Sequence, residues 1–183
     1  MNCYILIGGR SQRMGMSKTA LFLDRIVAAA GPVFAEVIAV QRSGGEAASS
    51  IRTIFEAAHD DEAAVFGLAR ALADAPGRCF VLAVDYPLMS SELLAYLARD
   101  GRVPAWDGRT QPLCAVWDPS VLPRVERRIA DRLYDLHGLI EQEIIPEPEL
   151  RARFPGEPLL NVNTPEELQE AERRHGQRFL SSR

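Results

Sequence analysis

The chain has little cysteine and no long apolar run. Its 183 residues include three cysteines, Cys3, Cys79 and Cys114, which are widely separated and lack the paired spacing of a zinc site or a disulfide framework. The first apolar run, Cys3 to Ile7, is too short for the core of a signal peptide, and no later run reaches membrane-spanning length. We therefore expect a cytoplasmic protein with no membrane association.

The chain also lacks an excess of basic charge. Lys and Arg number 21 against 25 Asp and Glu, which gives a formal net charge of −4. A protein that coats nucleic acid normally carries a basic excess or a basic stripe, so this balance favours a small ligand over nucleic acid. With 47% apolar residues the chain has enough core for one ordinary domain. We predict a single domain over residues 1–183.

Short β-rich runs alternate with segments of helical periodicity. This alternation predicts an α/β fold in which helices cover both faces of a mostly parallel sheet. The run Cys79 to Val84 is continuously apolar, as is typical of a central strand buried on both faces. Asp107-Gly108 lies between two strand-like runs and predicts a hairpin, and with it an antiparallel strand near the edge of a mixed sheet. The acidic, proline-rich stretch from Ile145 to Pro158 predicts a surface excursion with at most one helical turn.

The predicted strands are Cys3 to Ile7, Val37 to Gln41, Arg52 to Phe55, Cys79 to Val84, Val103 to Trp106, Leu113 to Trp117 and Leu160 to Val162, and the predicted helices are Leu21 to Ala30, Ala63 to Ala73, Ser91 to Arg99, Val121 to Arg128 and Pro165 to Arg174.

A loop rich in glycine and arginine follows the first predicted strand. It reads Gly8-Gly9-Arg10-Ser11-Gln12-Arg13-Met14-Gly15, with Lys18 close behind. Glycines let the backbone turn its N–H groups toward a phosphate, and three nearby cations suit the charge of a nucleoside triphosphate. The loop is neither a P-loop nor a G-x-G-x-x-G fingerprint. The alternative is a glycine turn with solvated basic side chains.

This loop resembles the opening motif of the molybdenum cofactor guanylyltransferases, known as molybdopterin-guanine dinucleotide biosynthesis protein A. The resemblance implies a Rossmann-like three-layer α/β/α sandwich of the nucleotide-diphospho-sugar transferase type. It implies catalytic roles for Arg13 and Lys18, although Ser17 stands where the family has aspartate and the segment after Lys18 is short. The residues that it implies for nucleotide binding in this region are Leu6, Ile7, Gly8, Gly9, Arg10 and Ser11.

Asp85 directly follows the apolar run that ends at Val84. A carboxylate at the end of a central strand should lie at the same sheet edge as the N-terminal loop, where its hard oxygens suit Mg²⁺. The alternative is a cap or turn residue ahead of the helix Ser91 to Arg99. By resemblance, Asp85 matches the metal-binding aspartate of a Cys-Asp-x-Pro motif, with Val84 in place of the cysteine. The resemblance makes it catalytic and nucleotide-binding as well.

The segment from Leu160 to Leu168 resembles the closing motif of the same family. Thr164 and Glu167 also form an ordinary capping box, so part of this segment needs no ligand to explain it. Alternation along a strand would put Asn161 and Asn163 on one face. The resemblance implies that Asn163 lies near the phosphates, the metal and the second substrate.

Other positions match the family less closely. Gln41 stands where the family has an asparagine near the nucleotide, and Glu56 is the best match for an acidic nucleotide-binding residue, with Asp60 or Asp61 as alternatives. Gly67 matches a glycine ahead of a helix, although Ala64-Val65-Phe66 replaces the usual Gly-Pro-Leu. Arg109 falls in a segment that lies near the second substrate in the family, and the alternative is a surface arginine at a hairpin tip.

The remaining histidines and aromatic residues read as structural. His59, His137 and His175 have no metal-site spacing and are predicted to be surface residues. Trp106, Trp117 and Tyr134 are predicted to belong to the core rather than to stack on a base.

Taken together, the resemblance implies Mg²⁺-dependent transfer of GMP from GTP to the terminal phosphate of molybdopterin, with release of pyrophosphate. It also implies transient contact with molybdenum cofactor biosynthesis or acceptor proteins. The alternatives are transfer of CMP or another nucleotide to a phosphorylated metabolite, and a nucleotide-binding paralogue without catalysis. Ser17 and the missing Gly-Pro-Leu motivate the last of these.

Overall fold

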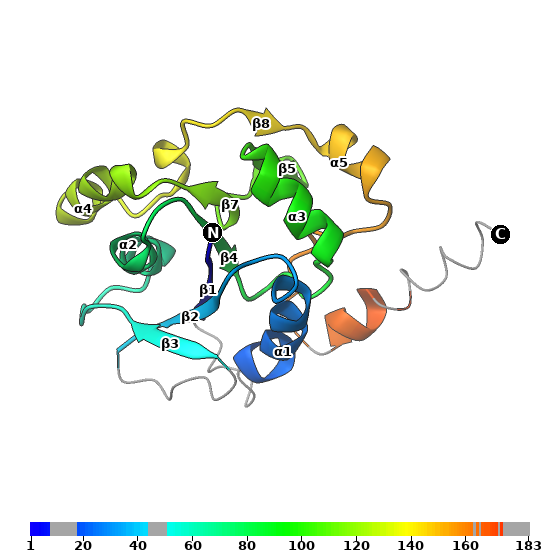
Figure 1. Cartoon of the computed structure of the whole chain (residues 1–183), viewed down its shortest axis with the longest axis horizontal. Helices are drawn as coiled ribbons and strands as arrows, with labels where there is room; N and C mark the ends of the chain where they lie inside the picture. Colours follow the sequence, from blue (N-terminus) through cyan, green and yellow to red (C-terminus); the bar gives the residue numbers. More distant parts are fainter. Residues whose placement is uncertain (8–17, 44–50, 163, 165, 172, 174–183) are drawn as a thin grey trace.

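Five strands form the main sheet in the order β3-β2-β1-β4-β7 (Figure 1). The structure is a computed structural model that describes residues 1–7, 18–43, 51–162, 164, 166–171 and 173. The first four strands are mutually parallel, and β7 pairs with β4 in the antiparallel direction. The sheet is therefore mixed, as predicted, with its antiparallel strand at one edge. The strands are β1 (Cys3–Ile7), β2 (Val37–Gln41), β3 (Arg52–Phe55), β4 (Cys79–Ala83) and β7 (Cys114–Trp117).

Helices cover both faces of this sheet. In Figure 1, α2 and α4 lie on one side of the strands, and α1 and α3 lie on the other. The predicted three-layer α/β/α sandwich is thus confirmed. The helices are α1 (Lys18–Ala30), α2 (Ala64–Asp74), α3 (Ser91–Asp100), α4 (Leu122–Ala130) and α5 (Glu147–Arg153), with two short 3₁₀ helices, η2 (Pro119–Val121) and η3 (His137–Leu139). Residues 166–171 are helical as well.

Alternation along β1 divides the apolar residues between two cores. Cys3, Ile5 and Ile7 face the core shared with α1 and α3, whereas Tyr4 and Leu6 face the core shared with α2 and α4. All five are buried, as expected of a central strand in a doubly covered sheet. Removing this much apolar surface from water fixes the position of the strand.

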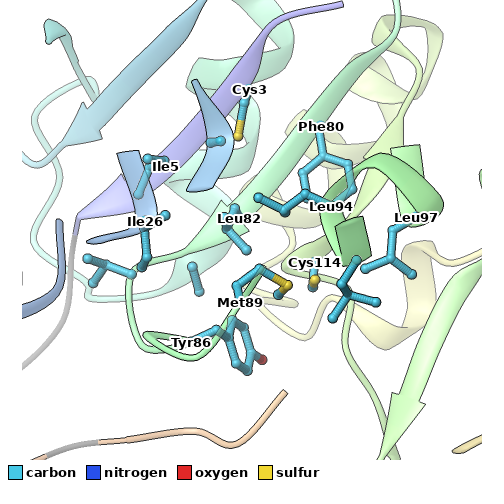
Figure 2. Packing of buried hydrophobic residues seen from close by; sticks show 14 of the residues in the cluster. Cys3, Ile5, Ile26, Phe80, Leu82, Tyr86, Met89, Leu94, Leu97 and Cys114 are labelled. Carbon is cyan, nitrogen blue, oxygen red and sulfur yellow. The ribbon is translucent and has the colours of Figure 1, made fainter. Parts of the chain in front are cut away.

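Figure 2 shows the first core around the neighbouring strand β4. Phe80 and Leu82 of β4 pack with Ile26 of α1 and with Leu94 and Leu97 of α3. Tyr86 and Met89, which follow the strand, belong to the same cluster. The turn after β4 is therefore anchored by buried side chains on either side of Asp85.

A second, smaller sheet has the order β6-β5-β8. It comprises β5 (Val103–Trp106), β6 (Arg109–Thr110) and β8 (Ile144–Ile145). Asp107 and Gly108 join β5 to β6 with φ values of 51° and 69°, the left-handed pair that a two-residue hairpin requires. The predicted hairpin is confirmed, but it belongs to this small sheet, and the antiparallel strand of the main sheet is β7.

Two sequence predictions are wrong. The stretch from Ile145 to Pro158 holds the seven-residue helix α5 rather than at most one turn, because Pro146 is its N-cap and Pro148 stands in its first turn, where a proline does not break a helix. Acidic residues in its first turn and basic residues in its last complement the helix dipole, and Leu150 is buried. Leu160 to Val162 is not a strand. Residues 160–162 have no regular secondary structure, and the backbone N–H of Val162 donates a hydrogen bond of 2.9 Å to the carbonyl of Asp85.

The buried aromatic residues follow the prediction. Trp106 and Trp117 are buried in the core, and Tyr134 is partly buried against the core beneath α2 and α4. The three cysteines are buried and form no disulfide. None of the helices in the described part of the chain is both long and apolar enough to cross a membrane.

Candidate functional site

The strand order of the main sheet changes direction between β1 and β4. From β1 the chain proceeds to β2 and then to β3 on one side, and it returns to place β4 on the other side. The strand order thus reverses between β1 and β4, and in open α/β sheets ligands bind at such a reversal, beyond the carboxyl ends of the strands. β1 ends at Ile7, and Leu6 pairs with Ala83 at the end of β4. Ile7 and Asp85 therefore lie at the same edge of the sheet.

Asp85 carries a buried oxygen that has no partner among the described residues. Its Oδ2 accepts a hydrogen bond of 2.6 Å from the side-chain amide of Asn161, whereas its Oδ1 is buried and unpaired. A buried polar atom left unpaired costs about 1–3 kcal/mol. A carboxylate oxygen is also the ligand that Mg²⁺ prefers. The orphaned Oδ1 therefore fits a bound cation.

Of the two alternatives for Asp85, the cap of the following helix does not hold, whereas the turn does, because Asp85 lies in the turn after β4. Helix α3 is capped by Ser90, whose hydroxyl oxygen accepts a hydrogen bond of 3.2 Å from the backbone N–H of Leu93. The backbone carbonyl of Asp85 accepts a hydrogen bond from the N–H of Val162, and its carboxylate accepts one from Asn161. The backbone and the side chain of Asp85 therefore both bind the segment at residues 161–162. The side chain is held in place without any part in the helix.

A network built on Tyr86 links the Asp85 turn to the small hairpin. The buried hydroxyl of Tyr86 donates to Gln111 Oε1 at 2.7 Å, and Gln111 Nε2 donates to the backbone carbonyls of Trp106 and Arg109 at 3.1 and 3.3 Å. Burial, and then the charge of Asp85, raises the pKa of Tyr86, so it stays a neutral donor. The exposed Arg109 is thereby held on the hairpin attached to the Asp85 turn. Sequence reasoning missed Tyr86 and Gln111, although Tyr86 directly follows Asp85.

Gln41 and Glu56 lie at the same edge, on the other side of β1. Gln41 ends β2 and pairs with Ile7, and its backbone carbonyl accepts a 2.8 Å hydrogen bond from the N–H of Glu56, just after β3. The side-chain Oε1 of Gln41 is buried without a partner in the described part of the chain. Strands lie about 4.8 Å apart, so Asp85 and Glu56 stand at opposite ends of one row of strand termini.

Gly67 lets the carboxylate of Glu56 approach helix α2. A Cβ at this position would lie 3.0 Å from Glu56 Oε1 and 3.2 Å from the methyl groups of Leu6. The side chain of Glu56 is 10% exposed, whereas Asp60 and Asp61 are exposed. Of the three acidic candidates, Glu56 is the one that the structure brings to the sheet edge.

One histidine prediction is wrong. The side chain of His59 is 14% exposed rather than a surface group, because its ring is enclosed by Glu56, the carbonyl of Asp61 and the ring of Phe66. The spacing of three residues to Glu56 is the only signal in the sequence that could have indicated this contact. His137 is exposed, as predicted, and His175 lies outside the described residues.

Several predicted site residues lie outside the described part of the chain. They are Gly8, Gly9, Arg10, Ser11, Arg13, Ser17 and Asn163. Lys18 is the first residue of α1. Leu6 and Ile7 are buried in opposite cores, which leaves their backbone groups as the means by which they could contact a ligand. Thr164 caps the last helical segment, because its hydroxyl oxygen accepts a 3.1 Å hydrogen bond from the N–H of Glu167.

In the described part of the chain, no group of three or more His, Cys, Asp or Glu side chains is placed to hold a metal ion. The combination of a doubly wound sheet, an unpaired carboxylate oxygen where the strand order reverses and polar groups along the same edge is typical of an α/β protein that binds a ligand at the carboxyl ends of its strands.

Comparison with known proteins gives the family. The profile of the MobA-like NTP transferase domain family matches residues 3–144. The chain is 32% identical over 186 residues to a probable molybdenum cofactor guanylyltransferase from Pelotomaculum thermopropionicum, covering 91% of this chain and 89% of the relative. It is 31% identical to the molybdenum cofactor guanylyltransferase of Sinorhizobium fredii, covering 92% and 88%.

Solved structures show the same fold. The crystal structure of molybdopterin-guanine dinucleotide biosynthesis protein A from Archaeoglobus fulgidus superimposes with a TM-score of 0.79 at 24% identity, covering 97% of this chain and all of the other. The 2-C-methyl-D-erythritol 4-phosphate cytidylyltransferase of Thermus thermophilus gives a TM-score of 0.60 at 18% identity, covering 93% and 96%. The chain belongs to the MobA-like NTP transferase family, which confirms the resemblance of its motifs.

The unpaired oxygen of Asp85 generates a prediction about stability. Asp85→Asn keeps an oxygen for the amide of Asn161 but removes the buried negative charge. We expect its free energy of unfolding to rise by about 1 kcal/mol in metal-free buffer, or about 2–4 °C in Tm for a chain of this size. We also expect Mn²⁺ to raise the Tm of the wild type and not that of the variant.

The control is Asp24→Asn, at an exposed position of α1. It should leave both the metal-free Tm and its response to Mn²⁺ unchanged. An Asp85→Asn protein that Mn²⁺ stabilises as much as the wild type would contradict the assignment of Oδ1 to a cation.

Proposed function

We propose that this protein transfers GMP from GTP to the terminal phosphate of molybdopterin and releases pyrophosphate. The observation that carries the proposal is the unpaired Oδ1 of Asp85 at the switch point, on the edge where the glycine- and arginine-rich loop begins. The names of the relatives at 31–32% identity support the nucleotide and the acceptor. The site has two parts, one on each side of β1. The part around Asp85 is the phosphate end, and the part around Gln41 and Glu56 is the base end.

The phosphate end performs the transfer in this proposal. An oxygen of the acceptor phosphate attacks the α-phosphorus of GTP, and the bond between that phosphorus and the β-phosphate oxygen breaks. A phosphate monoester with a second pKa of about 6 is largely ionised at neutral pH, so no side chain has to act as general base. Arg13 and Lys18 would stabilise the charge that develops on the leaving pyrophosphate.

Asp85 would hold Mg²⁺ through its Oδ1, with Asn161 fixing the carboxylate by its bond to Oδ2. When bound, Mg²⁺ supplies positive charge to the phosphate oxygens. Arg109, on the hairpin that Gln111 and Tyr86 attach to this turn, would meet the phosphate of the acceptor. By resemblance Asn163 joins them.

The base end selects guanine. An ionised carboxylate is an acceptor only, and guanine presents two donors on one edge, its N1–H and its 2-amino group. Glu56, largely buried beside Gly67 and Leu6, would accept both. Cytosine presents a single amino donor on the corresponding edge. The neighbouring amide of Gln41 would contact the nucleotide with its unpaired Oε1.

A nucleotide panel tests the proposed function. Purified protein, molybdopterin and Mg²⁺ are combined with GTP, ITP, CTP or ATP, and pyrophosphate release is measured. Two hydrogen bonds to a charged group contribute about 3 kcal/mol or more, so we expect kcat/KM for GTP to exceed that for CTP by about 100-fold. Faster release from CTP would identify a cytidylyltransferase. Binding of GTP without any release would identify a non-catalytic paralogue.

Gly67 gives a further prediction about the base end. In Gly67→Ala the new Cβ meets the Glu56 carboxylate and Leu6, so Glu56 has to move. We expect the KM for GTP to rise about tenfold with little change in kcat, because a hydrogen bond to the base is misaligned. The fold should persist, since alanine favours a helix over glycine by about 1 kcal/mol.

The matched control is Gly77→Ala, where a Cβ meets no atom within 4 Å. Steady-state kinetics on both variants at saturating molybdopterin separate the two positions. An unchanged KM for GTP in Gly67→Ala would place the base away from Glu56.

A further inference from the structure

The ring of His59 is enclosed by three neighbours at the base end. Its Nε2 lies 3.0 Å from Glu56 Oε2, and its Nδ1 lies 2.5 Å from the backbone carbonyl oxygen of Asp61. Its face stacks on the ring of Phe66, with the centroids 3.6 Å apart and the planes inclined by 16°. Phe66 stands in the first turn of α2, next to Gly67. The ring therefore has little freedom to turn.

The loop between β3 and α2, which carries His59, is itself held by contacts with other parts of the chain. The backbone carbonyl of His59 accepts a 3.0 Å hydrogen bond from Arg42, whose guanidinium also pairs with Glu62 at 2.7 Å. The carboxylate of Asp61 accepts a hydrogen bond from the hydroxyl of Tyr134. These contacts tie the loop between β3 and α2 to the end of β2 and to the segment after α4. The imidazole is thus fixed by its backbone as well as by its ring.

Both ring nitrogens of His59 face acceptors. A neutral imidazole has one N–H, whereas the imidazolium has two and can donate to the Asp61 carbonyl and to Glu56 at once. Among the described residues, His59 is the one whose side chain is placed to donate a hydrogen bond to the largely buried carboxylate of Glu56.

The contact with His59 also fixes the direction of the other carboxylate oxygen of Glu56, Oε1. With Oε2 held by His59, Oε1 is directed toward Gly67 and Leu6, and no described residue donates to it. A free glutamate side chain loses rotamer freedom when it is ordered. A carboxylate fixed before the ligand arrives avoids that cost during binding. Each oxygen keeps a lone pair for a ligand, because a carboxylate has about four acceptor sites.

We propose that His59 is a positioning residue that holds the Glu56 carboxylate ready for the N–H donors of a purine base edge. The inference rests on the proposed function, because it assigns Glu56 to guanine. It adds a residue that the sequence indicated to be a surface group. Two side chains then recognise the base: Glu56 contacts it, and His59 fixes Glu56.

Two substitutions separate the two contacts of the ring. The amide nitrogen of glutamine can take the position of Nε2 and donate to Glu56, so His59→Gln should keep the KM for GTP within about threefold of the wild type. The amide nitrogen of asparagine takes the position of Nδ1 and reaches only the Asp61 carbonyl. His59→Asn should raise the KM about tenfold or more, with kcat and the KM for molybdopterin unchanged.

A direct readout accompanies the kinetics. The affinity for GTP and for ITP, which lacks the 2-amino group, is measured by calorimetry without acceptor. We expect His59→Asn to lower the preference for GTP over ITP and His59→Gln to retain it. The controls are His137→Asn and His137→Gln, at an exposed position bonded to Thr110, which should behave alike.

A purely structural role for His59 predicts the opposite pattern. Equal effects of the two substitutions on KM, or a larger effect of His59→Gln, would overturn the inference while GTP turnover by the wild type sustained the proposed function. If the wild type prefers another nucleotide, the proposed function fails. The same pair of variants is then compared with that nucleotide, and a selective rise in KM for His59→Asn still supports the positioning role, whereas its absence overturns it.

Discussion

A buried carboxylate oxygen that has no partner among the described residues, at the carboxyl ends of two neighbouring parallel strands, is the constraint on which the rest of this site depends. The turn after β4 places Asp85 there because Val84 and Tyr86 are buried on either side of it. Asn161 engages one oxygen and leaves the other unpaired. That arrangement costs stability in the free protein, and the proposed cation would offset this cost. Such local costs are common where a protein is shaped for a ligand rather than for its own stability.

The row of strand ends separates two kinds of chemistry. Beside β4, Asp85 is joined to the hairpin through Tyr86 and Gln111, and in the proposed function it would hold the cation that contacts the phosphate groups. Beside β3, Glu56 lies against Gly67, and in the proposed function it would be the acceptor for the base. β1 lies between them and carries the loop that the family shares. Since each group is fixed by the core beneath it, a bound nucleotide needs to order few side chains, which favours tight binding and in-line geometry.

Sequence reasoning predicted the fold well where patterns are long. The continuous apolar run of β4 was enough to predict a central strand, and the Asp107-Gly108 pair was enough to predict a hairpin. The end of the apolar run predicted that Asp85 lies at the edge of the sheet. The prediction for residues Leu160 to Val162 was wrong because three residues are too few to distinguish a strand from an extended segment. The bond between Asn161 and Asp85, 76 residues apart, and the enclosure of His59 depend on tertiary contacts that no local pattern contains.

The most direct test of the account is a crystal structure of the protein with GTP and Mn²⁺, in which anomalous scattering locates the metal. We expect a manganese peak bonded to Asp85 Oδ1 and in contact with the triphosphate, with the guanine edge against Glu56 on the far side of β1. A nucleotide bound away from the carboxyl ends of β1 and β4, or a metal that leaves Oδ1 unpaired, would contradict it.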